Sequence, residues 1–232
     1  MIYLIANWKS HHTITQSLLW LEQFQQLQPT IPPHITPIIC LPFTDIPEFN
    51  RRLSDTNFPL ITAAQNVSPF PAGKHTGEVT AQMLSELVSY CLIGHSERRQ
   101  QFKETNQLVA QKAQQLLHYR ITPIICLDTP QLEDQIKALI AQDVNPEDCL
   151  FAYEPISAIG TGQAISPQIA NQFATNISLL TSPQTKVLYG GSVTADNVSN
   201  FISQPHLHGV LVGTDSLTPE DLHHIINSTP KQ

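Results

Sequence analysis

The sequence predicts an α/β fold in which eight parallel strands close into a (β/α)8 barrel, and three observations lead to this prediction. Eight short apolar segments recur along the 232 residues. They are nearly continuous in Ile, Val, Leu, Ala and Cys, as strands buried on both faces of a parallel sheet are. Segments with helical spacing lie between them. The eight alternations occupy residues 1–232 as a single domain and leave no room for a second one.

The strands are expected at the apolar segments. They are Tyr3–Asn7, Thr36–Leu41, Leu60–Gln65, Tyr90–Gly94, Thr122–Leu127, Leu150–Glu154, Val187–Gly190 and Val210–Gly213. An open doubly wound sheet would also alternate strands with helices, but no G-x-G-x-x-G turn follows the first strand here. The run Ile-Thr-Pro-Ile-Ile-Cys-Leu occurs at 35–41 and again at 121–127, which favours a repeated unit.

Apolar residues at three- and four-residue spacing predict the helices. These groups are Leu18, Leu21, Phe24 and Leu27; Met83, Leu84, Leu87 and Val88; Leu108, Leu116 and Leu117; Ile136, Leu139 and Ile140; and Ile169, Phe173 and Ile177. The final helix also has a start signal, with Thr218 as N-cap, Pro219 at its first position, and the acids Glu220 and Asp221 in its first turn.

The charge composition argues against a nucleic-acid-binding protein. Twelve Lys and Arg residues stand against nineteen Asp and Glu residues, so the net charge is −7, and no basic run is present. Phosphate backbones are bound by clustered basic residues. No stretch approaches the ~18 apolar residues of a membrane span. We therefore expect a soluble, cytoplasmic protein with no nucleic-acid and no membrane partner.

The four cysteines are expected to be buried, reduced core thiols. Cys40, Cys91, Cys126 and Cys149 all lie inside apolar, strand-like runs and form no C-x-x-C pair. Such a pattern is typical of a reducing compartment. No activating residue stands beside any of them, so a catalytic cysteine is not expected.

Three polar residues at strand ends carry the candidate chemistry. Glu154 follows a buried strand, where a carboxylate is costly unless it is used or paired, and it could act as a general base. The alternative is an acid that faces the surface. His95 precedes Ser96, which could cap a short helix and favour a neutral imidazole, or His95 could be a packed core histidine. Lys9 would stabilise negative charge, although a lone lysine is usually solvated.

Glycine-bearing segments after the last strands resemble anion-binding backbone. They are Ala158–Gly162, Tyr189–Val193 and Leu211–Thr214. The last two follow strands seven and eight, the usual phosphate position in such barrels, and glycine lets main-chain N–H groups approach the anion. Ordinary turns would explain Gly190 and Gly191 equally well. No histidine cluster has metal-ligand spacing, because His206 and His208 lack a nearby third ligand, so no metal site is expected.

In combination, these residues resemble the triosephosphate isomerase family over essentially the whole chain. The matching motifs, in family order, are Asn7-x-Lys9, Ala64-Gln65-Asn66, Thr76-Gly77-Glu78, Gly94–Arg99, Ala152–Pro155, Ala158–Gly162 and Tyr189–Val193. A glutamate base paired with a neutral histidine is the established pairing of that family. The resemblance implies a TIM barrel that isomerises a small triose phosphate without a cofactor.

The resemblance also implies the role of each site residue. Glu154 would be the base, His95 the electrophile, and Lys9 with Asn7 the pair that orients the substrate. Glu97 would be the acid beside Lys9. The phosphate amides would come from Gly160, Ser192, Gly213 and Thr214, and residues from Pro155 to about Ile165 would form a closing lid. A homodimer is implied, in which loop 66–78 carries Thr76 to the active site of the partner.

Several positions depart from the family pattern. Ser157 stands where the family usually has a tryptophan in the first lid hinge, and Gln163 replaces the usual lysine in the second. Thr214 replaces a glycine of the phosphate turn, and Leu127-Asp128-Thr129 replaces the usual Gly-Glu pair. We expect these changes to alter the closure of the lid and the geometry around the phosphate.

The first hypothesis is therefore an isomerase that interconverts dihydroxyacetone phosphate and D-glyceraldehyde 3-phosphate through an enediolate, in glycolysis and gluconeogenesis. Two alternatives stand beside it. One is a barrel isomerase for a larger sugar phosphate. The other is a catalytically decayed barrel that only binds phosphate ligands or protein partners, which the altered hinges favour and the intact set of Asn7, Lys9, His95, Glu97 and Glu154 opposes.

Overall fold

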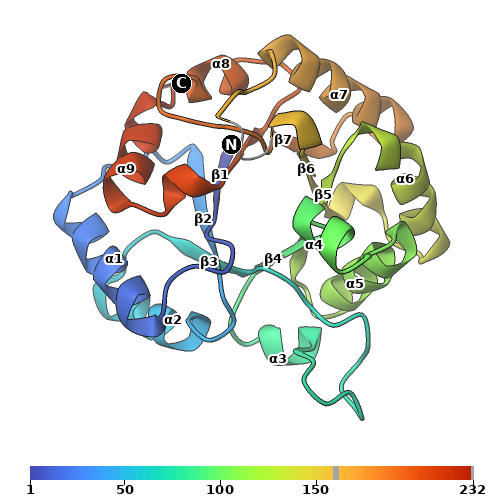
Figure 1. Ribbon diagram of the computed structural model, residues 1–232, viewed down its shortest axis with the longest axis horizontal. Helices are drawn as coiled ribbons and strands as arrows, with labels where there is room; N and C mark the ends of the chain where they lie inside the picture. The colour runs from blue at the N-terminus through green and yellow to red at the C-terminus, as the bar shows by residue number, and fades with distance from the viewer. Residues whose placement is uncertain (159–161, 231–232) are drawn as a thin grey trace.

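A closed barrel of parallel strands forms the centre of the protein in the computed structural model, which describes residues 1–158 and 162–230 (Figure 1). The strands follow one another around the barrel in chain order, and β1 pairs with both β2 and β8. Their bounds in the described residues are β1 (Ile2–Asn7), β2 (Ile35–Leu41), β3 (Ile61–Ala64), β4 (Tyr90–Ile93), β5 (Thr122–Leu127), β6 (Leu150–Tyr153), β7 (Lys186–Tyr189) and β8 (Gly209–Val212). The predicted (β/α)8 barrel is confirmed.

Each predicted strand is present, and its bounds differ from the prediction by no more than one residue. The differences at the carboxyl ends are informative. Gly94, Glu154, Gly190 and Gly213 were included in the predicted strands, but each lies just beyond the hydrogen-bonded ladder. Gly94 has a φ of 66°, a left-handed conformation that ends a strand and suits glycine. These residues therefore begin the loops that hold the site.

Helices surround the barrel in a ring (Figure 1). Those in the described residues are α1 (Ile14–Gln26), α2 (Ile46–Thr56), α3 (Ala81–Leu84), α4 (Ser96–Gln101), α5 (Asn106–His118), α6 (Leu132–Ala141), α7 (Pro167–Leu180), α8 (Val198–Ile202) and α9 (Pro219–Ser228), with 3-10 turns η1 (Thr129–Gln131), η2 (Pro146–Asp148), η3 (Ile156–Ala158) and η4 (Thr214–Ser216). The predicted start of α9 is confirmed, because the Thr218 hydroxyl accepts a hydrogen bond from the Asp221 amide. None of the helices described is long and apolar enough to cross a bilayer.

The helix expected around Met83 to Val88 is much shorter than its pattern suggested. Only one turn forms, and the amides of Leu87 and Val88 both donate to the Leu84 carbonyl, at 2.9 and 3.0 Å. The helix ends there in a tight turn, and β4 begins at Tyr90. Leu84 and Val88 are still buried. The apolar spacing therefore predicted correctly that these side chains are buried, but it overestimated the length of the helix.

The core consists of two apolar layers, one inside the barrel and one between the strands and helices. Successive residues of one strand serve the two layers in turn. In β2, for example, Ile38 and Cys40 point into the barrel while Ile39 and Leu41 pack beneath the helices. This double burial explains the continuous apolar character of the strands. The four cysteines are free and buried, as predicted, and burial raises the pKa of each thiol.

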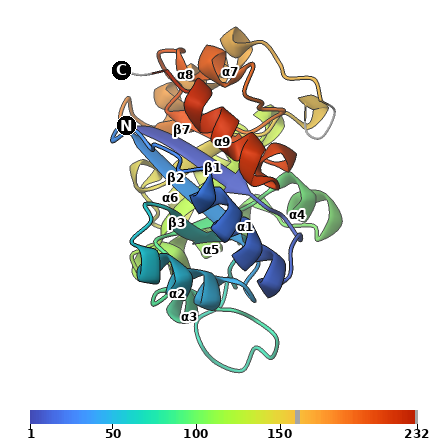
Figure 2. The same cartoon turned by 90° about the vertical axis from the view of Figure 1, so that its left-hand side faces the viewer.

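The loop between β3 and α3 projects from the barrel beside α3 (Figures 1 and 2). Its two ends are joined by a hydrogen bond from the Ser68 amide to the Val79 carbonyl, at 2.8 Å. Near its tip, the rings of Phe70 and His75 stack with centroids 4.4 Å apart. Thr76 is exposed. The loop is therefore held in a defined shape by contacts within itself.

One half-buried histidine makes the stability of the fold depend on pH. His208 precedes β8, and its Nδ1 accepts a hydrogen bond of 3.2 Å from the Val187 amide. Burial first, and then the charge of Lys186, lower the pKa of His208 to about 4. Between about pH 6.5, the ordinary value for histidine, and that lowered pKa, the unfolded chain binds more protons than the folded one. Stability should therefore fall as the pH is lowered through this range.

The variant His208→Asn should flatten this dependence, because asparagine supplies an acceptor oxygen but does not titrate. The expected difference between pH 7 and pH 4 is on the order of 1–2 kcal/mol, after allowing for the partial exposure of the ring. Urea unfolding at a series of pH values measures it. His206→Asn, at an exposed neighbour, is the control and should follow the wild type. A profile for His208→Asn as steep as that of the wild type would contradict the assignment.

Candidate active site

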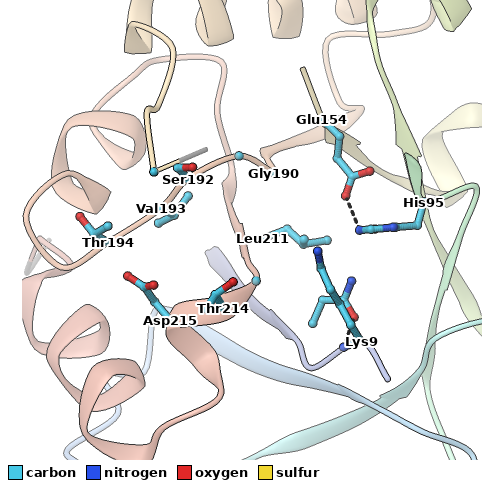
Figure 3. Close-up of a pocket in the computed structure, with 14 residues that line it drawn as sticks. Lys9, His95, Glu154, Gly190, Ser192, Val193, Thr194, Leu211, Thr214 and Asp215 are labelled. Atoms are coloured by element: carbon cyan, nitrogen blue, oxygen red, sulfur yellow. Dashed lines mark hydrogen bonds and ion pairs between the residues drawn. The ribbon is translucent and has the colours of Figure 1, made fainter. Parts of the chain in front are cut away.

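A cavity of about 270 Å³ opens at the carboxyl ends of the strands (Figure 3). The residues around it follow β1, β4, β6, β7 and β8, which the closed barrel brings to one mouth. The predicted site residues that line it are Asn7, Lys9, His95, Glu154, Ser192, Gly213 and Thr214. Glu97 lies beside the cavity in contact with Lys9. Gly160, predicted as a phosphate amide, lies outside the described residues.

The Glu154 carboxylate is buried, and it contacts the His95 ring and one backbone amide. Its Oε1 lies 3.3 Å from His95 Nε2, and its Oε2 accepts a hydrogen bond of 3.1 Å from the Ser96 amide. Only 2% of the residue is exposed, so the alternative of a surface-facing acid is wrong. Gly190 packs against it so closely that an added Cβ would meet Glu154 Cγ at 3.1 Å. The glycine after β7 therefore leaves the carboxylate the room it occupies.

The His95 ring points its Nε2 atom toward Glu154 and its Nδ1 atom toward the protein backbone. Nδ1 accepts a hydrogen bond of 3.3 Å from the Glu97 amide, which requires a lone pair on that nitrogen. The Glu97 carboxylate is also near Nδ1, but at 3.7 Å it is beyond hydrogen-bond distance. The ring is therefore neutral with its proton on Nε2. The expectation that Ser96 caps the helix was wrong, because His95 itself is the N-cap of α4 and Ser96 is the first helical residue.

Arg99 fixes the turn that carries His95. Its guanidinium donates to the carbonyl oxygens of Gly94, at 2.7 Å, and of Cys126, at 3.1 Å. The same group also binds the side chains of Asn106 and Gln135, both at 2.8 Å. Because the rigid guanidinium fork ties the ends of β4 and β5 to neighbouring helices, the backbone before His95 has little freedom.

Lys9 is presented to the cavity by an unusual backbone conformation. Its φ is 54°, in the left-handed region that few non-glycine residues adopt. The buried Asn7 stabilises this conformation, because its Oδ1 accepts a hydrogen bond of 3.0 Å from the Lys9 amide. The Lys9 ammonium lies 2.7 Å from Glu97 Oε1. Burial acts to raise the pKa of Glu97, but the hydrogen bond and the charge of Lys9 outweigh it and leave this pKa below its ordinary value.

Backbone amides gather at the opposite end of the cavity. Among the described residues, no acceptor is bound by the amides of Ser192, Gly213 and Thr214. Gly191 permits this turn, because a Cβ there would overlap the Tyr189 hydroxyl. Unpaired N–H groups beside a cavity are the kind of backbone that binds an anion. Lys9 is the one lysine or arginine among the described residues that line the cavity.

The described parts of the expected lid are tied to the barrel mouth on both sides. The Ile156 amide donates to Asp128 Oδ2 at 3.2 Å, and the Ser192 hydroxyl donates to the Ala158 carbonyl at 2.8 Å. At the other end of the expected lid, the Ile165 amide donates to the Tyr189 hydroxyl at 3.2 Å. The side chain of Ser157 lies outside the described residues, so its expected effect on the hinge stays a prediction.

Two acidic residues at the site were not predicted to take part in it. Asp128 was noted only as a departure from the family, yet its carboxylate binds both the Thr129 and Ile156 amides. Asp215 follows the predicted phosphate amide Thr214 and lines the cavity. A signal for Asp215 was present in the sequence, since a charged side chain beside a predicted phosphate turn is unexpected. In the described residues, no group of His, Cys, Asp and Glu has the arrangement of a metal site.

The fold and the site together define a class of protein: a (β/α)8 barrel whose mouth carries a carboxylate, a neutral imidazole and an ammonium group beside backbone amides that no described residue binds. The family model of triosephosphate isomerase matches residues 2–229 of the chain. The chain is 37% identical over 230 residues to the triosephosphate isomerase of Mesomycoplasma hyorhinis, covering 92% of this chain and 93% of that protein. It is 36% identical to the enzyme of Synechocystis, with 99% of each chain covered.

This chain belongs to the triosephosphate isomerase family, and it is an isomerase. The similarity covers both ends of the barrel and every strand. The departures at Asp128 and Thr214 therefore lie within an otherwise complete family fold.

We predict that Asp128 anchors the first lid hinge. Asparagine has one acceptor oxygen instead of two, so Asp128→Asn can satisfy the Thr129 amide only at the expense of Ile156. A hydrogen bond to a charged group contributes about 1.5–3 kcal/mol. The Ile156 amide should then exchange with solvent about tenfold faster. Native-state hydrogen exchange measures this rate. Asp134→Asn on α6 removes the same charge from an exposed site and is the control; an unchanged rate in Asp128→Asn would contradict the prediction.

Proposed function

We propose that this chain interconverts dihydroxyacetone phosphate and D-glyceraldehyde 3-phosphate through an enediolate, with Glu154 as the base. One observation carries the proposal: Glu154 Oε1 and His95 Nε2 face one another, 3.3 Å apart, inside a cavity whose cation is Lys9. A base, a neutral hydrogen-bond donor and a cation are what proton transfer beside a carbonyl requires. The names of the relatives support this substrate.

In the proposed reaction, the phosphate binds the amides of Ser192, Gly213 and Thr214 at one end of the cavity. The carbonyl end then lies between Glu154 and His95. Glu154 takes a proton from the carbon beside the carbonyl, and the electron pair moves onto the carbonyl oxygen. The Nε2 proton of His95 stabilises that oxygen and passes to it, and the ring takes the proton of the hydroxyl on the neighbouring carbon in exchange. The proton on Glu154 then returns to that neighbouring carbon, whose oxygen becomes the new carbonyl. No step draws on a cofactor.

The contacts of Glu154 support a base that can move. Glu154 is held by His95 and by the Ser96 amide, which are both donors that a substrate oxygen could engage instead. Substrate binding would free the carboxylate to reach the carbon. The neutral ring of His95 suits this step, since its Nδ1 is occupied as an acceptor and the proton stays on Nε2. Lys9 and Asn7 would orient the oxygens of the substrate.

We predict that Glu154→Asp retains the fold but loses turnover. The shorter side chain draws the carboxylate back by one methylene, and a displacement of about 1 Å can cost ~10²-fold in rate. A coupled assay of glyceraldehyde 3-phosphate isomerisation measures it. Glu86→Asp, the same change at an exposed position, is the control. If the wild type has no isomerase activity, the proposed function is wrong; if Glu154→Asp matches the wild type while chemistry limits turnover, the assigned base is wrong.

We also propose a homodimer in which loop 66–78 of one copy fills a second cavity on the other. This cavity, of about 410 Å³, adjoins the active site and is lined by Lys9, His95, Glu97 and Gln65 among others. Phe43 and Phe102 line it and are exposed at 36% and 63%. Exposed apolar side chains around a polar centre are typical of an interface. The projecting loop, with the exposed Thr76 beyond its stacked rings, has the shape to fill such a cavity.

We predict that Thr76→Arg weakens the dimer, because it places a second cation near Lys9 of the other copy. Light scattering should show a dimer for the wild type and a shift toward monomer for the variant, with lower activity. Thr30→Arg adds the same charge at the opposite end of the barrel, in the α1–β2 segment, and is the control. A fully active wild-type monomer at assay concentration would contradict the proposed assembly.

The proposed place of this reaction is the cytoplasm, in glycolysis and gluconeogenesis. Four free, buried thiols in one chain are consistent with a reducing compartment.

A further inference from the structure

Asp215 lines the end of the cavity where the proposed phosphate amides converge. It belongs to η4, directly after Gly213 and Thr214. Its carboxylate extends from η4 toward the segment after β7 that carries Val193 and Thr194, across the same space (Figure 3). An anion bound to the amides would therefore lie beside a side chain that can itself be negative.

No positive group among the described residues offsets this carboxylate. It forms neither an ion pair nor a hydrogen bond with them. Burial first, and then the like charge of Asp221, raise the pKa of Asp215. Lys9 lines the same cavity, but its ammonium is already bound to Glu97, 2.7 Å away.

The other titratable groups around η4 do not change this balance. They are Lys9 and His12 beside β1, Glu220 and Asp221 on α9, and His95 and Glu154 across the cavity. Three of these six are carboxylic acids. Burial, followed by the neighbouring His11, lowers the pKa of His12, which therefore carries less charge at neutral pH.

We propose that Asp215 weakens the binding of the phosphate dianion and links that binding to the uptake of a proton by its own carboxylate. The inference rests on the proposed phosphate site. An ionised Asp215 repels the dianion, whereas a protonated Asp215 does not and can donate a hydrogen bond to a phosphate oxygen. Phosphate affinity then falls as the pH rises through the titration of Asp215. If binding raises this pKa by one unit, the two forms differ about tenfold in affinity.

As a consequence, Asp215 lowers the affinity of the site for both the substrate and the product. Asp215 does not reach the reacting carbons, which lie at the Glu154 end of the cavity. Its charge therefore acts equally on the ground state and the transition state. Such uniform binding changes KM and leaves the chemical step unchanged. Asp215 is thus a residue that determines affinity and aids product release.

The decisive experiment is a calorimetric titration with inorganic sulfate. Sulfate is a tetrahedral dianion at every pH used, so any proton taken up on binding enters the protein and not the ligand. Wild type, Asp215→Asn and the control Asp196→Asn are titrated at mildly acidic and mildly alkaline pH. Two buffers of different ionisation enthalpy give the number of protons taken up. Asp196 is an exposed acid after β7 that does not line the cavity, and its variant changes the net charge equally.

At alkaline pH, Asp215→Asn should bind sulfate about tenfold more tightly than the wild type. At acidic pH, it should take up fewer protons, and Asp196→Asn should match the wild type in both measurements. With glyceraldehyde 3-phosphate, Asp215→Asn should lower KM by a similar factor without raising the chemical rate. Asp215→Ser, which is also neutral, repeats the test if the asparagine variant folds poorly.

Equal affinity and equal proton uptake in Asp215→Asn and the wild type would overturn the inference. So would an equal gain in Asp196→Asn, since the effect would then be one of net charge. These results differ from a failure of the proposed function. If the wild type isomerises triose phosphate while Asp215→Asn leaves KM unchanged, the enzyme assignment stands and the role of Asp215 is wrong. If no variant binds sulfate, both the anion site and the role of Asp215 are wrong.

Discussion

Closure of the sheet is the constraint on which the site depends. The pairing of β1 with both β2 and β8 brings the two ends of the chain together, and every strand then ends at the same mouth. Lys9 from the first loop and Thr214 from the last line one cavity for this reason alone. The double burial of the strands stabilises that closure and requires their continuous apolar sequences. The chemistry is therefore restricted to the first residues beyond each strand.

Those first residues are shaped by close packing as much as by chemistry. Gly190 leaves room for Glu154, Gly191 leaves room for Tyr189, and Gly94 turns the chain to present His95. Where a charged residue is needed, a polar neighbour stabilises the strained backbone, as Asn7 does for Lys9. A motif such as Asn7-x-Lys9 is consequently a unit, since the amide side chain of one residue holds the backbone of the other.

The sequence was sufficient to predict the strands and most of the polar residues that line the cavity, because both follow from local patterns. A buried strand has a continuous apolar sequence, and its first polar successor lies at the mouth, so Glu154 and His95 were found at the predicted places. Contacts between segments far apart in the sequence were not predictable in the same way. Asp128 binds the Ile156 amide, and His95 caps its own helix, through orientations that depend on how neighbouring loops pack. The length of α3 likewise depends on where β4 must begin.

The electrostatics of the cavity follow from which charges are already neutralised. Lys9 is the cation of the cavity, but Glu97 holds it at 2.7 Å, and the pKa of Glu97 stays low because of that contact. The pair positions the ammonium and reduces its long-range field at the same time. In the proposed function, an incoming dianion would thus depend more on the unpaired amides of Ser192, Gly213 and Thr214 than on net positive charge. In such a site, one additional carboxylate at the amide end would have a large effect, because no positive group in the described part of the chain compensates it. By this proposal, the placement of Asp215, and not the net charge of the chain, sets how strongly a phosphate is held.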